Sequence, residues 1–218
     1  MKNSIFIFSA SAITLCSVLS VEAQTKSDTT DKETNVKVDS SVTNKAISHQ
    51  DTLKEEKSKV LGGAEMLPSK NIIDNTSKSK DHTTLVSVIK SAGLTDSLKS
   101  KGPFTVFAPT NEAFSKLPAG TLETLEKPVN KEKLVEVIEF HVVPGKLTAR
   151  DLALAVARGN GNATLTTVEG ENLNVSINTE KNLQITDGKG NIALVTMFDV
   201  VQSNGVVHVI NNVLLPKE

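Results

Sequence analysis

The chain has 218 residues with 24 Lys and Arg against 25 Asp and Glu, and these charges are interspersed along the sequence. Such a balance excludes nucleic-acid binding that depends on a basic stripe. With seven Phe and no Tyr or Trp, few aromatic side chains are present on which sugars or bases could stack, which weighs against carbohydrate and single-stranded nucleic acid as ligands.

Residues 1–23 have the pattern of an export signal. Lys2 gives a positive start, the apolar run over residues 5–19 is interrupted only by Ser and Thr, and Ala23 offers a small residue before a cleavage site. The run is short for a membrane span of about 20 apolar residues. We therefore expect a secreted or periplasmic protein that is not inserted in a membrane after the signal is removed.

The only cysteine, Cys16, lies inside this signal. A chain cleaved after Ala23 has no thiol, which excludes disulfides, Cys-ligated metal and thiol catalysis. The alternative is that Cys16 becomes a lipid-modified N-terminus, as in bacterial lipoproteins, and tethers the protein to a membrane. The preceding Leu15 is not the small residue usually found before such a cysteine, so the sequence favours release over anchoring.

The composition of residues 24–59 favours a disordered, solvated spacer. The segment contains seven Lys, seven acidic residues and eleven Ser or Thr, but no Gly, Pro or aromatic residue. It buries too little apolar surface to offset a backbone ordering cost of about 1–2 kcal/mol per residue. The alternative is a tail modified by sugars, because residues 28–30 and 51–53 resemble the acceptor pattern of one bacterial O-glycosylation system.

Residues 60–218 are numerous enough for one domain with a single core. The first strong periodicity in this region has apolar residues at i, i+3, i+4 and i+7. It predicts a helix over residues 82–92, with Asp81 as its N-cap and Gly93 as its C-terminal stop.

A buried strand is predicted next, because β-branched and aromatic residues alternate over residues 104–108. Pro109 ends the strand, since proline has no N–H to donate to a ladder. Thr110 or Asn111 then provides the side-chain oxygen that caps a short helix.

Three more helices are predicted from residues that can cap a helix and from the Pro and Gly residues that end one. Thr121 is expected to cap a short helix that ends before Pro128, Asn130 a longer one, and Thr148 a helix that runs to Gly159. The apolar stripe of the longer helix consists of Leu134, Val137, Ile138 and His141.

From Ala163 onward the hydrophobic period changes from 3.6 to 2, which predicts short strands separated by Gly- and Asn-containing turns. These strands contain Leu165, residues 173–177, 183–185, 192–194 and 206–210, and Val213 to Leu215. Most predicted helices precede most predicted strands along the chain, and this segregation predicts an α+β fold.

Four separated segments of the chain resemble the fasciclin domain family. The segments are GPFTVFAPTNEAF at residues 102–114, NGVVHVINNVLLP at residues 204–216, the aromatic-His pair Phe140 and His141, and GGAEMLPSKNI at residues 62–72. They occur in the family's order and span residue 60 to the C-terminus. The chain is accordingly identified as a bacterial secreted single-domain member.

The resemblance implies a fold and a class of function. The fold is a seven-stranded β wedge or sandwich with helices packed to one side and end, in which the two signature segments are neighbouring strands at the centre. The function is adhesion or interaction at the cell surface or in the extracellular matrix. The partner is expected to be a surface protein or a polysaccharide, and no nucleic acid.

The resemblance also assigns candidate binding residues. The family's aromatic-His motif is implicated in adhesion to cell-surface receptors, although this chain has Phe where Tyr is common, and Asn211 stands where Asp is frequent. Asp199 and Val200 resemble a pair that is part of an integrin-contacting element in animal fasciclin domains. The candidate contact residues are Phe140, His141, Asp199, Val200, Asn211 and Asn212. The alternative for His141 is a structural role, in which the imidazole at the end of the helix donates hydrogen bonds to the terminal carbonyl groups.

Three residues of the signatures are expected to have structural roles: Thr110, Asn111 and His208. His208 lies in an otherwise apolar strand, so its imidazole needs hydrogen-bond partners. We expect those partners in the first signature strand and in the corner formed by Thr110 and Asn111.

The sequence gives no sign of an enzyme. It has no Gly-x-Ser-x-Gly elbow, phosphate-binding glycine loop or His-Glu-x-x-His helix, and its domain histidines are not paired at ligand spacing. We expect no metal site and no cofactor. The alternative function, of a different class, is a periplasmic or secreted small-ligand-binding protein or hydrolase with a site between sheet and helices.

Overall fold

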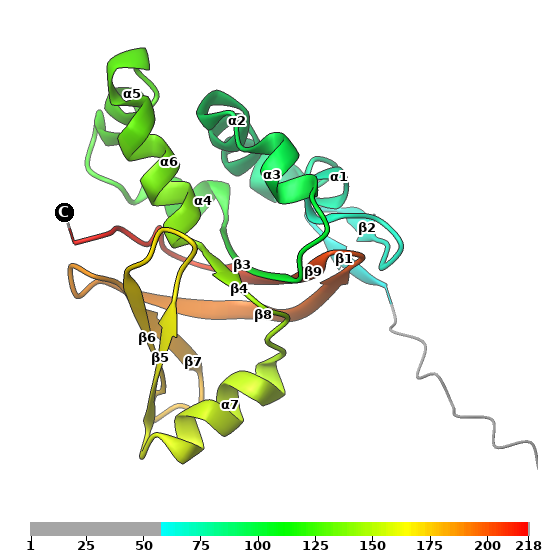
Figure 1. Ribbon diagram of the computed structural model, residues 1–218, viewed down its shortest axis with the longest axis vertical. Helices are drawn as coiled ribbons and strands as arrows, with labels where there is room; N and C mark the ends of the chain where they lie inside the picture. Colours follow the sequence, from blue (N-terminus) through cyan, green and yellow to red (C-terminus); the bar gives the residue numbers. More distant parts are fainter. Residues whose placement is uncertain (1–57, 218) are drawn as a thin grey trace, which may run out of the picture. The chain divides into compact units, whose positions relative to one another are not determined.

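In the computed structural model of this protein, the described residues are 58–217 (Figure 1). The predicted signal, Cys16 and the predicted spacer up to residue 57 lie outside this part of the chain. Lys59, which was expected to belong to the spacer, is the first residue of strand β1, Lys59–Leu61, which forms a hairpin with β2, Ala64–Met66. No sequence pattern predicted this hairpin.

Seven further strands form one mixed sheet in the order β4-β3-β9-β8-β7-β6-β5. Their bounds are β3 Phe104–Pro109, β4 Val142–Pro144, β5 Asn162–Thr166, β6 Asn172–Ile177, β7 Leu183–Thr186, β8 Ile192–Gln202 and β9 Gly205–Ile210. The pair β3 and β9 is parallel, and every other neighbouring pair is antiparallel. The predicted number of strands and the pairing of the two signature strands are confirmed, although these strands lie second and third from one edge rather than in the middle.

Close backbone contact explains two glycines at the start of the signature strands. A Cβ atom on Gly205 would lie 2.0 Å from the carbonyl oxygen of Phe104, and one on Gly102 would lie 2.1 Å from that of Asn204. Any side chain at either position would force the parallel strands apart.

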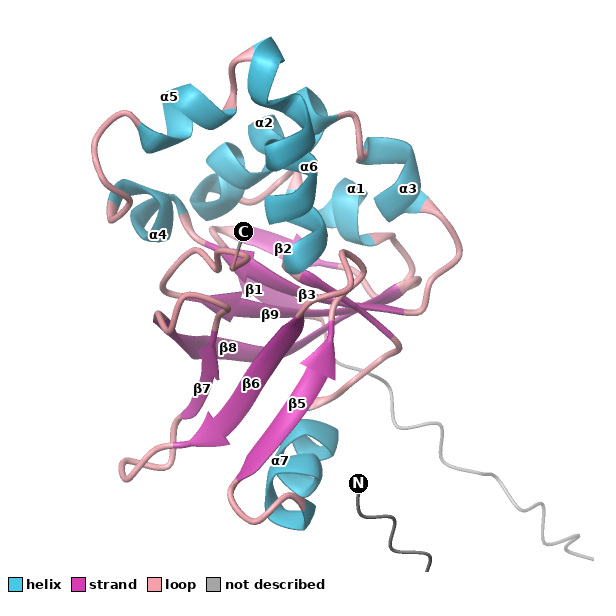
Figure 2. Ribbon diagram, turned by 60° about the vertical axis from the view of Figure 1, so that its left-hand side comes forward, coloured by secondary structure: helices cyan, strands magenta, loops and turns pink. Residues whose placement is uncertain are grey.

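The helices are segregated, as an α+β pattern requires. Their bounds are α1 Ile72–Thr76, α2 Thr83–Ala92, α3 Thr95–Lys99, α4 Asn111–Ser115, α5 Thr121–Leu125, α6 Lys131–Phe140 and α7 Ala149–Arg158, with 3₁₀ turns at Lys80–His82 and Pro128–Asn130. Figure 2 shows α1 to α6 gathered beside one end of the sheet and α7 at the opposite end. None of the helices described in residues 58–217 is long and apolar enough to cross a membrane.

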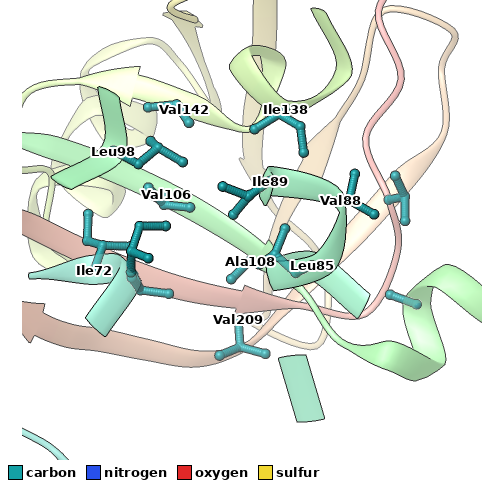
Figure 3. Packing of buried hydrophobic residues seen from close by; sticks show 14 of the residues in the cluster. Ile72, Leu85, Val88, Ile89, Leu98, Val106, Ala108, Ile138, Val142 and Val209 are labelled. Carbon is teal, nitrogen blue, oxygen red and sulfur yellow. The ribbon is translucent and has the colours of Figure 1, made fainter. Parts of the chain in front are cut away.

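Strand β3 contributes to two hydrophobic clusters because its side chains alternate. Val106 and Ala108 face the helices and pack with residues such as Leu85 and Ile138, as the close view in Figure 3 shows. Phe107 faces the other way and joins a second cluster with Phe140 and the inward residues of β6 to β8. The two clusters lie on opposite sides of the signature strands, so these strands are buried on both faces.

Local caps were predicted with mixed success. Thr110 caps α4 by accepting from the N–H of Ala113, Thr148 caps α7 in a capping box with Asp151, and Gly93 ends α2 in the left-handed region at φ 80°. These three predictions are confirmed.

Two other cap predictions are wrong, and a third is right only in position, because Asn130 is the N-cap residue of α6 but makes no side-chain bond to the helix. Asp81 lies in the 3₁₀ turn before α2, Thr121 is already the first residue of α5, and the side chain of Asn130 donates to the carbonyl of Thr124 instead of capping α6. The N–H of Thr84, in the first turn of α2, has no partner within the helix and donates to the Oδ1 atom of Asn111 at 3.0 Å. That acceptor comes from 27 positions later in the sequence, so no local pattern indicates it.

The predicted strand at Val213 to Leu215 is also wrong. Residues 211–217 follow β9 as a C-terminal tail without a place in the sheet. Strand β8, by contrast, continues to Gln202, well beyond the predicted residues 192–194, with register irregularities between Val195 and Val200.

Candidate functional site

The C-terminal tail is held by side chains rather than by a β ladder. Its successive backbone N–H groups donate to an imidazole and two carboxylates that come from separate elements. The bonds run from Leu214 to His141 Nε2 at 3.0 Å, from Leu215 to Asp187 Oδ2 at 2.9 Å, and from Lys217 to Glu171 Oε2 at 2.8 Å. These three acceptors explain why an apolar, strand-like segment stays outside the sheet.

His141 joins the end of α6 to the tail. Its Nδ1 atom lies 2.7 Å from the carbonyl oxygen of Val137 and therefore donates, while Nε2 accepts from the N–H of Leu214. The side chain is 4% exposed. Burial lowers the pKa of His141 to about 4, although the Val137 carbonyl and the nearby Asp187 act in the opposite direction. The ring is therefore neutral at physiological pH and faces no solvent.

Asp187 is a buried carboxylate for which the sequence predicted only a turn. Oδ1 accepts from the backbone N–H groups of Lys189 and Asn191, and Oδ2 accepts from the side chain of Asn191 and from Leu215. The first three bonds shape the β7–β8 turn, and the fourth fixes the tail to it. The sequence signal was an Asp that directly follows a strand and precedes Gly-Lys-Gly-Asn, a pattern typical of side-chain-stabilised turns.

Asp199 and His208 together hold the start of α7. The Oδ1 atom of Asp199 accepts from the N–H of Ala149, the first residue of the helix, at 2.7 Å. The N–H of Asp199 donates to His208 Nδ1 at 3.3 Å, so Nε2 carries the proton and donates to the carbonyl of Leu147 at 2.8 Å. Burial lowers the pKa of His208, against the effects of the Leu147 carbonyl and Asp199.

These contacts correct two expectations. His208 stacks on Phe107 of the first signature strand, with ring centroids 5.8 Å apart, but its hydrogen-bond partners are Leu147 and Asp199 and not the corner at Thr110 and Asn111. Asp199, which was expected to contact a partner, is half-buried at φ 51° in an irregular part of β8 and is bonded to another element of the same chain.

The candidate contact residues do not form one exposed patch. Phe140 and Val200 are completely buried, and His141 nearly so, so the expectation that these side chains face a partner does not fit the structure. Asn211 and Asn212 are half-buried and fasten the tail to β8. The side-chain bonds are Leu194 N–H to Asn211 Oδ1 at 2.8 Å and Asn212 Nδ2 to the Ile192 carbonyl at 2.7 Å.

An open hollow of about 560 Å³ borders the C-terminal tail. Its walls come from α5, α6, the β5–β6 and β7–β8 turns and the tail. Apolar side chains such as Leu125, Val137 and Leu215 line its interior, and charged ones such as Lys133 and Glu136 lie at its rim. Because His141, Asp187 and Glu171 position the tail, they set one wall of this hollow. Within residues 58–217, no three His, Cys, Asp or Glu side chains are grouped so that they could hold a metal ion.

Comparison with known proteins shows what this chain is similar to. It is 42% identical to protein sll1483 of Synechocystis over 74% of this chain and 82% of the relative. It is 36% identical to the transforming growth factor-beta-induced protein ig-h3 of Sus scrofa, over 68% of this chain but only 20% of that much longer protein. The immunogenic protein MPB70 of Mycobacterium bovis is 35% identical over 56% of this chain and 54% of its own length.

A solved structure and a family model complete the comparison. The FAS1 domain pair of the insect cell adhesion molecule Fasciclin I aligns with a TM-score of 0.41 and 20% identity, over 65% of this chain and 43% of that one. The model of the fasciclin domain matches residues 80–216, which include both signature strands, the α6 to His141 segment and most of the tail. The chain therefore belongs to the fasciclin domain family.

Proposed function

We propose that this protein is an exported, non-enzymatic fasciclin-domain module that mediates adhesion or interaction at the cell surface or in the extracellular matrix, where it binds a surface protein or a polysaccharide. The observation that carries this proposal is the hollow beside the tail, which combines an apolar interior with a charged rim. The most buried polar groups around it are already bonded to the backbone.

The hydrogen bonds of two buried histidines, His141 and His208, support binding rather than catalysis at their positions. Both ring nitrogens of His141 and both of His208 are bonded to backbone groups. Neither imidazole can exchange a proton with a ligand unless the tail or α7 is released, and a general base must lie within hydrogen-bond reach of its substrate. The His141 ring therefore connects the end of α6 to the tail that forms one wall of the hollow, and the His208 ring connects β9 to the segment before α7.

The composition of the hollow fits a side chain presented by a protein partner. Protein interfaces combine an apolar centre with a polar rim that excludes water. Here Leu125 and Leu215 form such a centre, and Lys133 and Glu136 on neighbouring turns of α6 offer charges of both signs at the rim. We therefore expect one apolar anchor residue of the partner to enter the hollow, flanked by charged contacts.

The test is to fill the hollow without disturbing the core. Thr124 is exposed on α5 and lines the hollow, so Thr124→Arg places a long side chain where the anchor should enter. Ser87→Arg on the exposed side of α2 adds the same charge elsewhere and is the matched control. The full chain should capture a surface component from the envelope and extracellular fractions of its own organism, the control should do the same, and Thr124→Arg should lose most of the capture. Equal capture by all three forms would contradict the proposal.

A second candidate function is favoured by the size of the hollow. A volume of about 560 Å³ falls in the range of about 300–1,000 Å³ typical of small-molecule sites. In that case the protein would be a small-ligand carrier or hydrolase. Native mass spectrometry of the full chain should then show a bound small molecule that Thr124→Arg displaces, and an ester-cleavage assay would separate a hydrolase from a carrier.

A further inference from the structure

The C-terminal tail is held by two kinds of bond that respond differently to acid. At its base, Asn211 and Asn212 bond to backbone groups of β8, which do not titrate. Beyond them, the three N–H groups that fasten the tail donate to one imidazole and two carboxylates. Each of these acceptors can take up a proton. The base is therefore attached independently of pH, whereas the attachment of residues 213–217 depends on it.

The bond to His141 is the one that a single proton must break. Its Nδ1 atom faces the carbonyl oxygen of Val137 at 2.7 Å, so the ring proton is on Nδ1 and Nε2 is left as the acceptor for the N–H of Leu214 at 3.0 Å. In the protonated ring both nitrogens carry hydrogen, and two N–H groups would then point at each other between His141 and Leu214. The closed position of the tail therefore requires a neutral ring.

The surroundings of the ring give a charged imidazole little support. The side chains of α2, α3, α4, β3 and β4 that share a small space with it are apolar. Asp187 favours the protonated ring, but its two oxygens already accept four hydrogen bonds. Burial therefore prevails and lowers the pKa of His141 to about 4. The other charged residues on the neighbouring turns, on α6 and on the tail lie along the hollow or beyond it: Lys133, Glu136, Glu169, Glu171, Lys189 and Lys217.

Apolar contacts keep the end of the tail closed while the ring is neutral. Val213 belongs to the first hydrophobic cluster and Leu214 to the second, and both are buried. Leu215 and Pro216, which line the hollow, are only half-buried. A short terminal segment outside the sheet has no ladder bonds to break, so its release costs less free energy than the release of a strand. Opening of the tail is therefore a local event.

We propose that residues 213–217 form an acid-released strap: protonation of His141 frees them from the domain and thereby removes one wall of the hollow. The consequence for binding rests on the proposed function, because it applies only if the partner occupies the hollow. A partner in contact with Leu215 or Pro216 then loses that contact in acid. The domain holds its partner near neutral pH and releases it as the pH falls.

The pH range follows from the two states of the ring. In the closed form burial lowers the pKa of His141 to about 4, whereas in the released form the ring faces water in the space that Leu214 leaves and titrates near its ordinary 6.5. The released form therefore binds the proton more tightly. It becomes more favourable as the pH falls from 6.5 to about 4, and the ratio of released to closed tail rises by roughly 300-fold in all.

Amide hydrogen exchange of the full chain, followed by NMR, measures the release. The protection factor, which corrects for the intrinsic pH dependence of exchange, should fall about 20-fold for the Leu214 amide between pH 7 and pH 5. Because the opening is local, this exchange should not respond to low concentrations of urea, in contrast to exchange of the buried amides of β9, which requires global unfolding.

Two substitutions identify the group that releases the strap. In His141→Gln the carboxamide can donate to the Val137 carbonyl and accept from Leu214 without titrating, so protection of the Leu214 amide should change less than about threefold over the same range. The matched control is His208→Gln, which replaces a buried histidine bonded to backbone groups away from the tail. Its tail should respond to pH as in the native chain, and circular dichroism shows whether both variants are folded.

The outcomes for the strap and for the proposed function are separate. The inference is wrong if protection of the Leu214 amide in the native chain does not change with pH, if its loss follows urea as in β9, or if a folded His141→Gln variant shows the same fall. Capture of an envelope component is measured independently at pH 7 and pH 5. Failure of capture at both values would contradict the proposed function, and the exchange data would still decide whether acid releases the strap.

Discussion

The two halves of the sheet differ in how their residues are used: one half carries the family motifs and is buried, and the other half has an exposed face. Strands β3 and β9 carry the motifs by which the family is identified, and β9 is buried along its whole length between the two hydrophobic clusters. Strands β5 to β7 have no part in either signature segment, yet one of their faces is open and uncharged. The comparison teaches that the motifs mark the framework of this protein, while the surfaces available to a partner come from less distinctive segments.

The largest effect is expected from a substitution inside the framework. Phe107 is completely buried and stacks on His208. Phe107→Ala leaves a cavity in the second hydrophobic cluster and should lower the free energy of unfolding by about 3–5 kcal/mol. Chemical denaturation of both forms measures the change. The matched outward variant Thr164→Val on β5 should change stability by less than about 0.5 kcal/mol, and a similar loss in both would remove the distinction between the halves.

A smaller effect is expected from protonation of the ring that joins the framework to the tail. Burial lowers the pKa of folded His141 to about 4 from an ordinary 6.5, so the unfolded chain binds this proton more tightly. The stabilising contribution is therefore complete above about pH 6.5 and is lost as the pH falls toward 4, by on the order of 3 kcal/mol.

The control for this prediction is a variant in which His141 is replaced by a residue that does not titrate. In His141→Gln, the other histidines and carboxylates still titrate, so the difference between the two stability–pH curves isolates His141. Unfolding measured by denaturant between pH 4 and pH 8 should show a smaller loss at low pH in the variant. Parallel curves would mean that the ring does not have to remain neutral to hold the N–H of Leu214.

Features with short sequence separation could be predicted, and features made by tertiary contacts could not. Thr110, Thr148 and Gly93 act on residues three or four positions away, so their patterns are complete in a short window. Asn111 binds an N–H 27 positions away, and Asp187 one 28 positions away. That β3 and β9 are neighbours followed from the family resemblance and not from periodicity, and their parallel direction was not predicted.

The candidate site was harder to predict for the same reason. The hollow is built from α5, α6, two turns and the tail, which are separated by up to about 100 residues in the chain, and no segment indicates it alone. Val213 to Leu215 have the alternation of a strand, but their position depends on acceptors from α6 and two turns. The motif residues His141 and Asp199 are informative about the fold because each bonds to a distant backbone N–H.

The smallest effect distinguishes a structural Asp199 from one that contacts a partner. Asp199→Ala removes the acceptor for the N–H of Ala149 at the start of α7 and places a side chain without local hydrogen bonds at φ 51°. The free energy of unfolding should fall by about 1–2 kcal/mol. Asp199→Asn keeps an oxygen acceptor and a residue type that tolerates the left-handed region, so it should lose less than half as much.

Capture of envelope components by the folded Ala variant should equal that of the native chain, because the carboxylate is engaged inside the molecule. Loss of capture in both variants, with stability unchanged, would instead make Asp199 a contact residue and move the recognition surface from the hollow to the irregular part of β8.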